Sequence, residues 1–327
     1  MTEQAMRALP FLGMPWVTWR QHRLALAGLV GVLGGLSLVL LVSGLRIHHA
    51  YRGFGLDHCP DLSVPACAGA ADDFYSETRD WENLTAIGLL PPLIGMFVGG
   101  PLLARELETG TFRFAWTQGV DRTRWLVTKL ALLGLAIAAA ALAFSALFAW
   151  WHAPFTRIGG RIDPGAAYEV EGVVFAARSV FAFALGTLIG AVLRRTVAAM
   201  AATGVASFAV LTSIIMFLRP HLVPPVTGVV PGNGRAQHTE WVLRWGLVGP
   251  GGHRLSAAEQ EGVFRHLAAV GQNEPLRWLL QHGYTQWETY QPDGRFWALQ
   301  SIEAGTLCLL ALALAAASLY LIRRRTV

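Results

Sequence analysis

The sequence predicts an all-α membrane protein that crosses the bilayer six times. Of its 327 residues, 54% are hydrophobic and only 14% are charged, whereas a soluble domain carries about 25% charged residues. The mean hydropathy is +0.43. The apolar runs of the sequence are continuous, which excludes the alternating apolar and polar pattern of an outer-membrane barrel. Each run is therefore expected to form a helix, because a helix satisfies its own backbone hydrogen bonds in hydrocarbon. Six segments reach the roughly 20 mostly apolar residues that a helical span needs: 24–45, 84–104, 130–151, 172–193, 197–218 and 303–322.

Basic residues gather on one side of this predicted topology. With the N-terminus inside, the inner segments hold 13 basic and four acidic residues. The outer segments, together with Glu303, hold 12 basic and 17 acidic residues. Lysine and arginine are enriched in cytoplasmic segments, so we expect the N-terminus and the C-terminus to lie inside (N-in/C-in). The net charge of +5 follows from this bias, and we predict no nucleic-acid partner.

The chain divides into a cytoplasmic N-terminal interface helix, a membrane unit of five spans, an extracytoplasmic subdomain, and a last span with a basic tail. These parts cover 1–23, 24–218, 219–302 and 303–327. The membrane unit has a long outer loop at 46–83 and one sizeable inner loop at 105–129.

The N-terminal helix is predicted to lie in the plane of the membrane. A spacing of three and four places four residues on one of its sides: Trp16, Trp19, Arg20 and Arg23. Tryptophan prefers the membrane interface, and arginine prefers the anionic inner leaflet. A plain anchor and a surface that contacts a partner both fit this pattern.

The second span is predicted to be kinked. Proline interrupts the backbone hydrogen bonds of a helix, and glycine permits a neighbouring helix to approach closely. The span holds Pro91, Pro92, Pro101, Gly95, Gly99 and Gly100.

Two charged residues fall in predicted spans. Arg178 lies about two turns into the fourth span, and Glu303 opens the sixth. Arg178 can snorkel to the outer face or pair with Glu303 or Glu171. The functional alternative is a substrate or proton pathway. No acidic residue stands near the middle of a span, which argues against a proton-driven carrier.

The outer subdomain is predicted to be ordered. Ser256 and Glu259 have the spacing of a capping box at the start of a helix. A second short helix is expected in EPLRWLLQHG, and a turn is expected at 292–294 between aromatic runs.

Catalytic and cofactor motifs are missing. The sequence has no GxxxxGK[ST], GxSxG or HExxH, so we predict no P-loop, no catalytic residue and no cofactor bound by this chain. His48, His49 and His58 are ligand types for zinc or copper, but no second group with matching spacing follows, and no metal is predicted. Cys59 and Cys67 can form a disulfide in an oxidising compartment, and Cys308 is expected to pack in the last span.

The inner loop, by contrast, carries several structural signals. Gly110 fits a helix end, and Asp121 fits the cap of the next helix. Between them Phe112, Phe114 and Trp116 alternate with polar neighbours. A passive connection would need only a few polar turn residues, so this loop is predicted to contact a partner.

These residues resemble the loop between the second and third spans of ABC-2-type transporter permeases. That family commonly shows a Glu-x-Gly-Thr start, a PVSR-like turn and a Gly-Lys before the third span. The matches are Glu108, Thr109, Gly110, Thr111, Val120, Arg122 and Lys129, and the departures are Gly119, Asp121 and Thr128. The TWRQHR segment, the six spans and the large last outer loop share the family's layout, and YQPDGRFWALQSIEAG resembles its actinobacterial branch.

The resemblance implies a type V exporter-like fold in a bacterial plasma (inner) membrane. Two such permeases would pair, as a homodimer or heterodimer, with two separate ATPase subunits that hold ATP and Mg²⁺. The pair would move an amphiphilic drug, lipid or peptide outward, and the inner loop would dock on the ATPase. The residues expected to couple the two subunits are Glu106, Glu108, Gly110, Thr111, Phe112, Phe114, Trp116, Asp121 and Arg122. The alternatives are a membrane enzyme, or a ligand-binding sensor or immunity protein, with its site in the outer loops.

Overall fold

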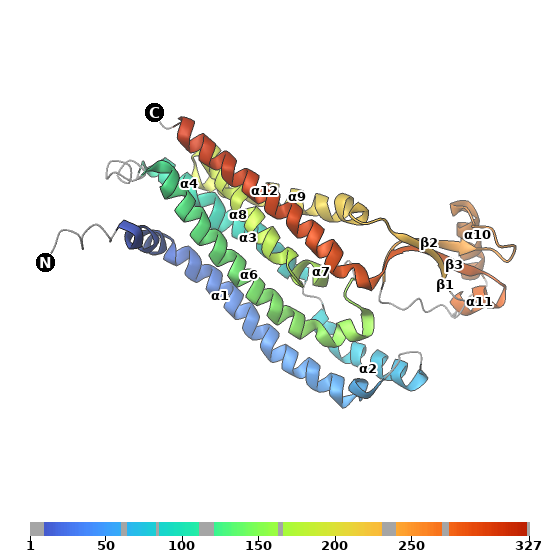
Figure 1. The fold of residues 1–327 in the computed structure, drawn as a ribbon. Coiled ribbons are helices and arrows are strands. Elements are labelled where there is room, and N and C mark those ends of the chain that lie inside the picture. Colours follow the sequence, from blue (N-terminus) through green and yellow to red (C-terminus); the bar gives the residue numbers. More distant parts are fainter. Residues whose placement is uncertain are drawn as a thin grey trace.

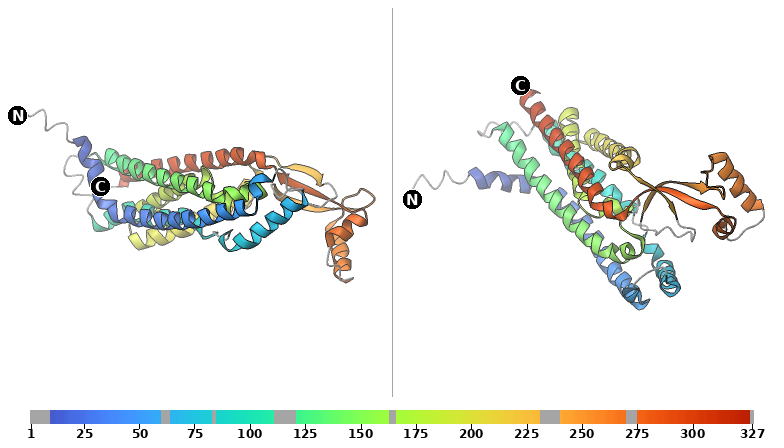
Figure 2. Two further views of the ribbon diagram at one scale, coloured as in Figure 1. Left: turned by 90° about the horizontal axis from the view of Figure 1, so that it is seen from below. Right: turned by 45° about the vertical axis from the view of Figure 1, so that its right-hand side comes forward.

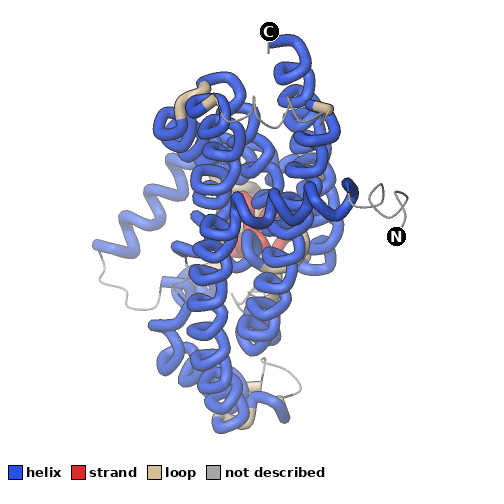
Figure 3. Tube along the Cα trace, turned by 90° about the vertical axis from the view of Figure 1, so that its left-hand side faces the viewer, coloured by secondary structure: helices blue, strands red, loops and turns tan. Residues whose placement is uncertain are grey.

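The computed structural model is a bundle of long helices with a small subdomain at one end (Figures 1 and 2). It describes residues 10–59, 64–82, 85–110, 121–162, 166–230, 240–269 and 275–325. Both termini lie at the opposite end of the bundle, which we call the terminal end, and the end near the strands is the subdomain end (Figure 1). Viewed from the terminal side, the strands lie behind the helices (Figure 3).

The structure confirms the predicted fold class, because six helical segments are long and apolar enough to cross a membrane. They are Ala27–Gly53, Ile87–Thr109, Arg122–Gly159, Val174–Leu193, Thr196–His221 and Asp293–Arg324. They belong to α1 (Pro10–Gly53), α3 (Leu90–Ile94) with α4 (Gly100–Thr109), α6 (Arg122–Gly159), α8 (Val174–Leu193), α9 (Thr196–Ser213) and α12 (Phe296–Arg325).

Helix α1 includes residues 10–23 of the predicted interface segment and also the first span. Its first turns, dark blue in Figure 2, lie at an angle to the rest of the helix. Trp16, Trp19 and Arg20 belong to these turns, and Arg23 is exposed.

The second span is irregular, as its prolines and glycines predict. A 3₁₀ turn, η2 (Thr85–Leu89), precedes α3, and a π-helical turn, η3 (Gly95–Gly99), separates α3 from α4. Helix α8 crosses this segment closely. A Cβ added at Gly95 would lie 2.6 Å from the Ala182 carbonyl oxygen, and one added at Gly186 would lie 2.5 Å from the Gly95 carbonyl oxygen. The glycines therefore let the second and fourth spans pack backbone to backbone.

Helix α8 is the centre of the bundle and packs against the second span, α6, α9 and α12. Its Ser179 and Thr187 hydroxyls donate to carbonyl oxygens one turn earlier in the same helix. Because these hydroxyls are satisfied locally, they bury in an apolar setting without an unpaired donor.

The loop after the first span packs on α6. It forms a short turn, η1 (Leu56–His58), and a helix, α2 (Pro65–Glu82). A disulfide joins Cys59 to Cys67 across it. Phe74 of α2 is fully buried and contacts the ring of Phe155 at 5.3 Å between centroids.

The subdomain between the fifth and sixth spans is built on a three-stranded antiparallel sheet. Its strands are β1 (Val226–Val230), β2 (Trp241–Val248) and β3 (Thr285–Gln291), in the order β1-β3-β2. Helices α10 (Ala257–Ala269) and α11 (Pro275–Gln281) form between β2 and β3. Leu247, Leu267 and Leu279 join the sheet to these helices in one small core.

Local signals placed the helix starts of this subdomain correctly. Ser256 donates through its hydroxyl and its backbone N–H to Glu259 Oε2, at 2.8 and 2.7 Å. The aromatic run before 292–294 is strand β3, and the turn itself, η6 (Asp293–Arg295), leads directly into α12. The last helix therefore begins about seven residues before the predicted span.

Candidate functional site

The inner loop starts where α4 ends, at the terminal end of the bundle (Figure 1). Helix α4 stops at Thr109, and Gly110 has a positive φ of 70°. Glycine adopts this left-handed conformation without the steric cost that a Cβ imposes. The described residues resume at Asp121, whose side chain accepts a hydrogen bond from the Arg124 N–H at 3.1 Å and caps α6. The predicted contact residues Thr111, Phe112, Phe114 and Trp116 lie outside the described residues.

A buried ion pair joins the two helices on either side of the loop. Lys129 of α6, the only lysine of the chain, is 2% exposed and donates to Glu106 of α4, which is 14% exposed. The Lys129 ammonium also lies 4.3 Å from the ring centroid of Trp125. Since a buried charge is costly without a partner, this pair holds the second and third spans together at the loop.

Glu108 ties the same segment to the fifth span. Its Oε2 accepts from the Thr196 N–H at 2.8 Å and from the Thr196 hydroxyl at 2.6 Å. Thr196 is the first residue of α9, so the carboxylate caps a helix N-terminus, where negative charge is favourable. The hydrogen-bond donor to Glu108, a residue expected to couple to the ATPase, is therefore a helix start within this chain. Such a pairing over 88 residues leaves no local signal.

The last helix completes this junction. Arg323 of α12 donates from Nε to the Thr123 hydroxyl of α6 at 2.8 Å. Arg122, at the first turn of α6, is half-buried. The ends of α4, α6, α9 and α12 thus meet beside the two ends of the inner loop, and we call this set of contacts the loop junction.

A second cluster of charges lies near the subdomain end of the spans. The Glu303 side chain of α12 is 1% exposed and accepts from Arg178 Nη2 at 2.6 Å and from Arg219 Nε at 3.0 Å. Glu169 of α7 (Ala166–Val170) lies 3.0 Å from Arg178 Nη1 and 3.5 Å from Arg219 Nη2. These four residues, which we call the charge cluster, join the fourth, fifth and sixth spans to α7.

The sequence identified only half of this cluster. Arg178 does not snorkel, because its side chain is 2% exposed and pairs with Glu303 and Glu169. Glu171, the other expected partner, instead faces His152 at 3.4 Å and Arg161 at 3.5 Å. Arg219 was assigned to the outer loop, although its position directly after an apolar run was a signal for a membrane-edge charge.

Uncharged contacts reinforce the charge cluster. The guanidinium carbon of Arg219 lies 4.4 Å from the ring centroid of Tyr168 in α7, and burial raises the pKa of the Tyr168 hydroxyl. Gln300 of α12 accepts from the Val174 N–H at 2.9 Å and donates to the carbonyl oxygens of Tyr168 and Glu171. The start of the sixth span is therefore fixed to the start of the fourth.

The histidines that suggested a metal have separate contacts. The Nε2 of His48 lies 2.9 Å from the backbone carbonyl oxygen of Trp150 in a hydrogen bond, and the imidazole stacks on the Trp150 indole. His49 is exposed, and His58 pairs with Asp57. Within the described ranges, no three His, Cys, Asp or Glu side chains gather as metal ligands would.

Comparison with protein-family models matches residues 29–219 to a family described as ABC-2 membrane transporter related. The match runs from the first span to Arg219 and so includes the parts of the loop junction on α4, α6 and α9 and most of the charge cluster. No curated protein and no solved structure matches the chain. Since the matched segment covers more than half of the 327 residues, this chain belongs to the ABC-2 membrane transporter related family.

Proposed function

We propose that the chain is the permease subunit of an ATP-driven exporter. Two six-span subunits would pair in a bacterial plasma membrane, two separate ATPase subunits would bind ATP and Mg²⁺, and an amphiphilic substrate would move outward. Family membership and the six spans support this function. The sequence has no P-loop, which supports a separate chain as the one that would bind the nucleotide.

The observation that carries the proposal is the loop junction. The Glu106–Lys129 pair ties the second span to the third, and Glu108 ties the second to the fifth. A force on the inner loop would therefore reach three spans at once instead of bending a single free helix. Packed elements joined by polar contacts are one means by which coupling energy passes between distant sites.

The charge cluster fixes the bundle at a second place and shares the fifth span with the contacts of Glu106 and Glu108. It joins the fourth, fifth and sixth spans near the end opposite the loop junction. With one end held by buried ion pairs, a displacement at the loop would tilt the spans about the subdomain end. In this scheme the ATPase supplies the chemistry, and this chain converts its closure into movement of helices.

Co-purification with a co-expressed ATPase subunit tests the docking step. Phe114→Ala with Trp116→Ala should reduce the recovered ATPase at least fivefold, because aromatic anchors dominate protein interfaces. Phe264→Ala is the matched control, since Phe264 is an exposed aromatic residue of the subdomain. An unchanged complex after the loop substitutions, or an equal loss in the control, would refute docking by this loop.

A substrate-dependent ATPase assay then tests transport. In lipid vesicles, amphiphilic substrates should stimulate ATP hydrolysis by the complex, and Lys129→Met should remove the stimulation while the ATPase still co-purifies. Ligand binding without any ATPase partner would instead support the sensor or immunity alternative.

A further inference from the structure

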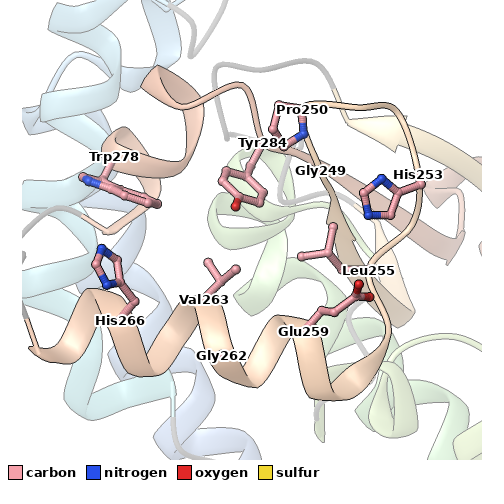
Figure 4. A pocket seen from close by; sticks show the side chains of 10 residues that line it. All are labelled: Gly249, Pro250, His253, Leu255, Glu259, Gly262, Val263, His266, Trp278 and Tyr284. Carbon is pink, nitrogen blue, oxygen red and sulfur yellow. The ribbon is translucent and has the colours of Figure 1, made fainter.

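The outer subdomain contains a pocket that the transport scheme does not use. It has a volume of about 390 Å³ and lies between the 249–255 turn, helix α10 and the segment from α11 to β3 (Figure 4). Pockets for small organic molecules begin at about 300 Å³. Helices α10 and α11 lie at the end of the subdomain away from the bundle (Figure 1), so a ligand would enter from the aqueous phase and not from the bilayer.

Aromatic rings form one wall of this pocket. Trp278 and Tyr284 line it with ring centroids 6.2 Å apart and planes inclined by 24°. His282 stacks on Trp278 at 3.8 Å, and His266 lies 5.7 Å from the same ring (Figure 4 shows Trp278, His266 and Tyr284). The faces of such rings carry negative electrostatic potential and attract cations within about 6 Å.

The charge of the pocket also favours a cation. Among the described residues that line the pocket, Glu259 is the only carboxylate, and the basic side chains are the two histidines, His253 and His266, with no lysine or arginine. Hydrogen bonds from Ser256 lower the pKa of Glu259, so its carboxylate is ionised at neutral pH. Two nearby guanidiniums have other contacts: Arg254 lies over the Trp287 ring at 4.5 Å, and Arg265 lies 3.7 Å from Glu261.

Gly262 supplies an independent reason to expect an occupant. It lies in the middle of α10 and lines the pocket, and a Cβ built there meets no protein atom within 4 Å. Glycine inside a helix costs about 1 kcal/mol relative to alanine. Among the described residues, no close packing requires the glycine, which lines the pocket beside Val263 (Figure 4).

We propose that this pocket binds an organic cation with an apolar or aromatic body, taken from the aqueous phase on the subdomain side of the membrane. The ring wall of Trp278 and Tyr284 contacts the body and the cationic centre, and Glu259 supplies the counter-charge. Leu255 and Val263 form the apolar floor. This site is independent of the ATPase-driven function proposed above and depends on binding alone.

Titration calorimetry on the full chain in lipid nanodiscs tests the site with two probes. Benzyltrimethylammonium should bind, whereas benzylsulfonate, which has the same benzyl body and a negative head, should not. Gly262→Leu fills the pocket and should weaken binding at least tenfold, and Gly262→Ala, the matched control, should stay within about threefold of the parent. Glu259→Gln keeps an acceptor for Ser256 and should weaken binding about fivefold to tenfold, as expected for loss of one charge contact.

Three results would overturn the proposal: no binding of the cation, equal binding of both probes, or full binding by Gly262→Leu. Because Gly262 is exposed and a Cβ built there meets no described protein atom within 4 Å, the leucine variant should fold, which circular dichroism verifies. Glu259→Gln provides a second reading that does not depend on filling the pocket. Unchanged affinity in that variant would contradict the role of charge and with it the proposal.

Discussion

Removing the negative charge of Glu303 should strongly destabilise the protein. Glu303→Gln keeps the side-chain shape but leaves one carboxylate, Glu169, against two buried guanidiniums. Both carboxylate oxygens of Glu303 accept hydrogen bonds, at 2.6 to 3.4 Å, and its side chain is 1% exposed. Loss of one partner of a buried ion pair costs about 3–5 kcal/mol. We expect the upper part of this range, because two arginines lose their shared partner.

A double-mutant cycle identifies the source of this loss. Arg178→Met should also destabilise the protein. The double variant should lose less stability than the sum of the losses in the two single variants, because contacting residues couple by about 0.5–3 kcal/mol. Unfolding in mixed micelles by increasing sodium dodecyl sulfate, followed by tryptophan fluorescence, gives each free energy of unfolding.

An exposed ion pair provides the control for this cycle. Glu261 and Arg265 lie 3.7 Å apart, and their side chains are 68% and 75% exposed. Exposed pairs contribute little, so Glu261→Gln should cause no measurable change. A loss below about 1 kcal/mol for Glu303→Gln, or strict additivity with Arg178→Met, would refute the charge cluster as a structural fixed point.

Three further predictions follow from the other contacts. Gly99→Leu should destabilise by about 1–3 kcal/mol in the same unfolding assay, because its Cβ would collide with the Phe183 backbone; stability equal to the parent would exclude the close helix crossing. Glu108→Ala should speed hydrogen exchange of the first amides of α9, because the cap on Thr196 is lost, and unchanged exchange there would argue against the cap. The Glu259 pKa is lowered in the folded state, so its stabilisation is present above its unfolded value and is lost as pH falls through the folded pKa. The amides at the start of α10 should therefore exchange faster near pH 3 than the intrinsic rate change explains, and Glu259→Gln should remove this pH dependence.

The sequence alone determined the features that depend on composition or on neighbouring residues. Long apolar runs predicted all six spans, because a bilayer of fixed thickness requires helices of a minimum length. The positive φ of Gly110, the cap at Asp121 and the Ser256–Glu259 box were also foreseeable. Each depends on residues at most three positions apart, so local chemistry suffices.

The sheet of the subdomain was not anticipated from the sequence. Strand β3 pairs with β1 about 60 residues earlier in the chain, between Val226 and Tyr290 at one end of the register. Helix signals at α10 and α11 were clear, whereas both strands that pair with β3 lie before these two helices in the chain. Strands that pair across two inserted helices leave no short-range pattern.

Only the tertiary structure decided which charges meet. Arg178 and Glu303 were visible as charges in apolar runs, but Glu169 and Arg219 joined them through the packing of α7, α8, α9 and α12. The links from Glu106 to Lys129 and from Glu108 to Thr196 arise in the same way. Hydropathy shows that a residue lies near the membrane and how far along the helix it sits. It gives no information on how one helix is rotated about its axis relative to another, and that rotation determines the partner of every buried charge.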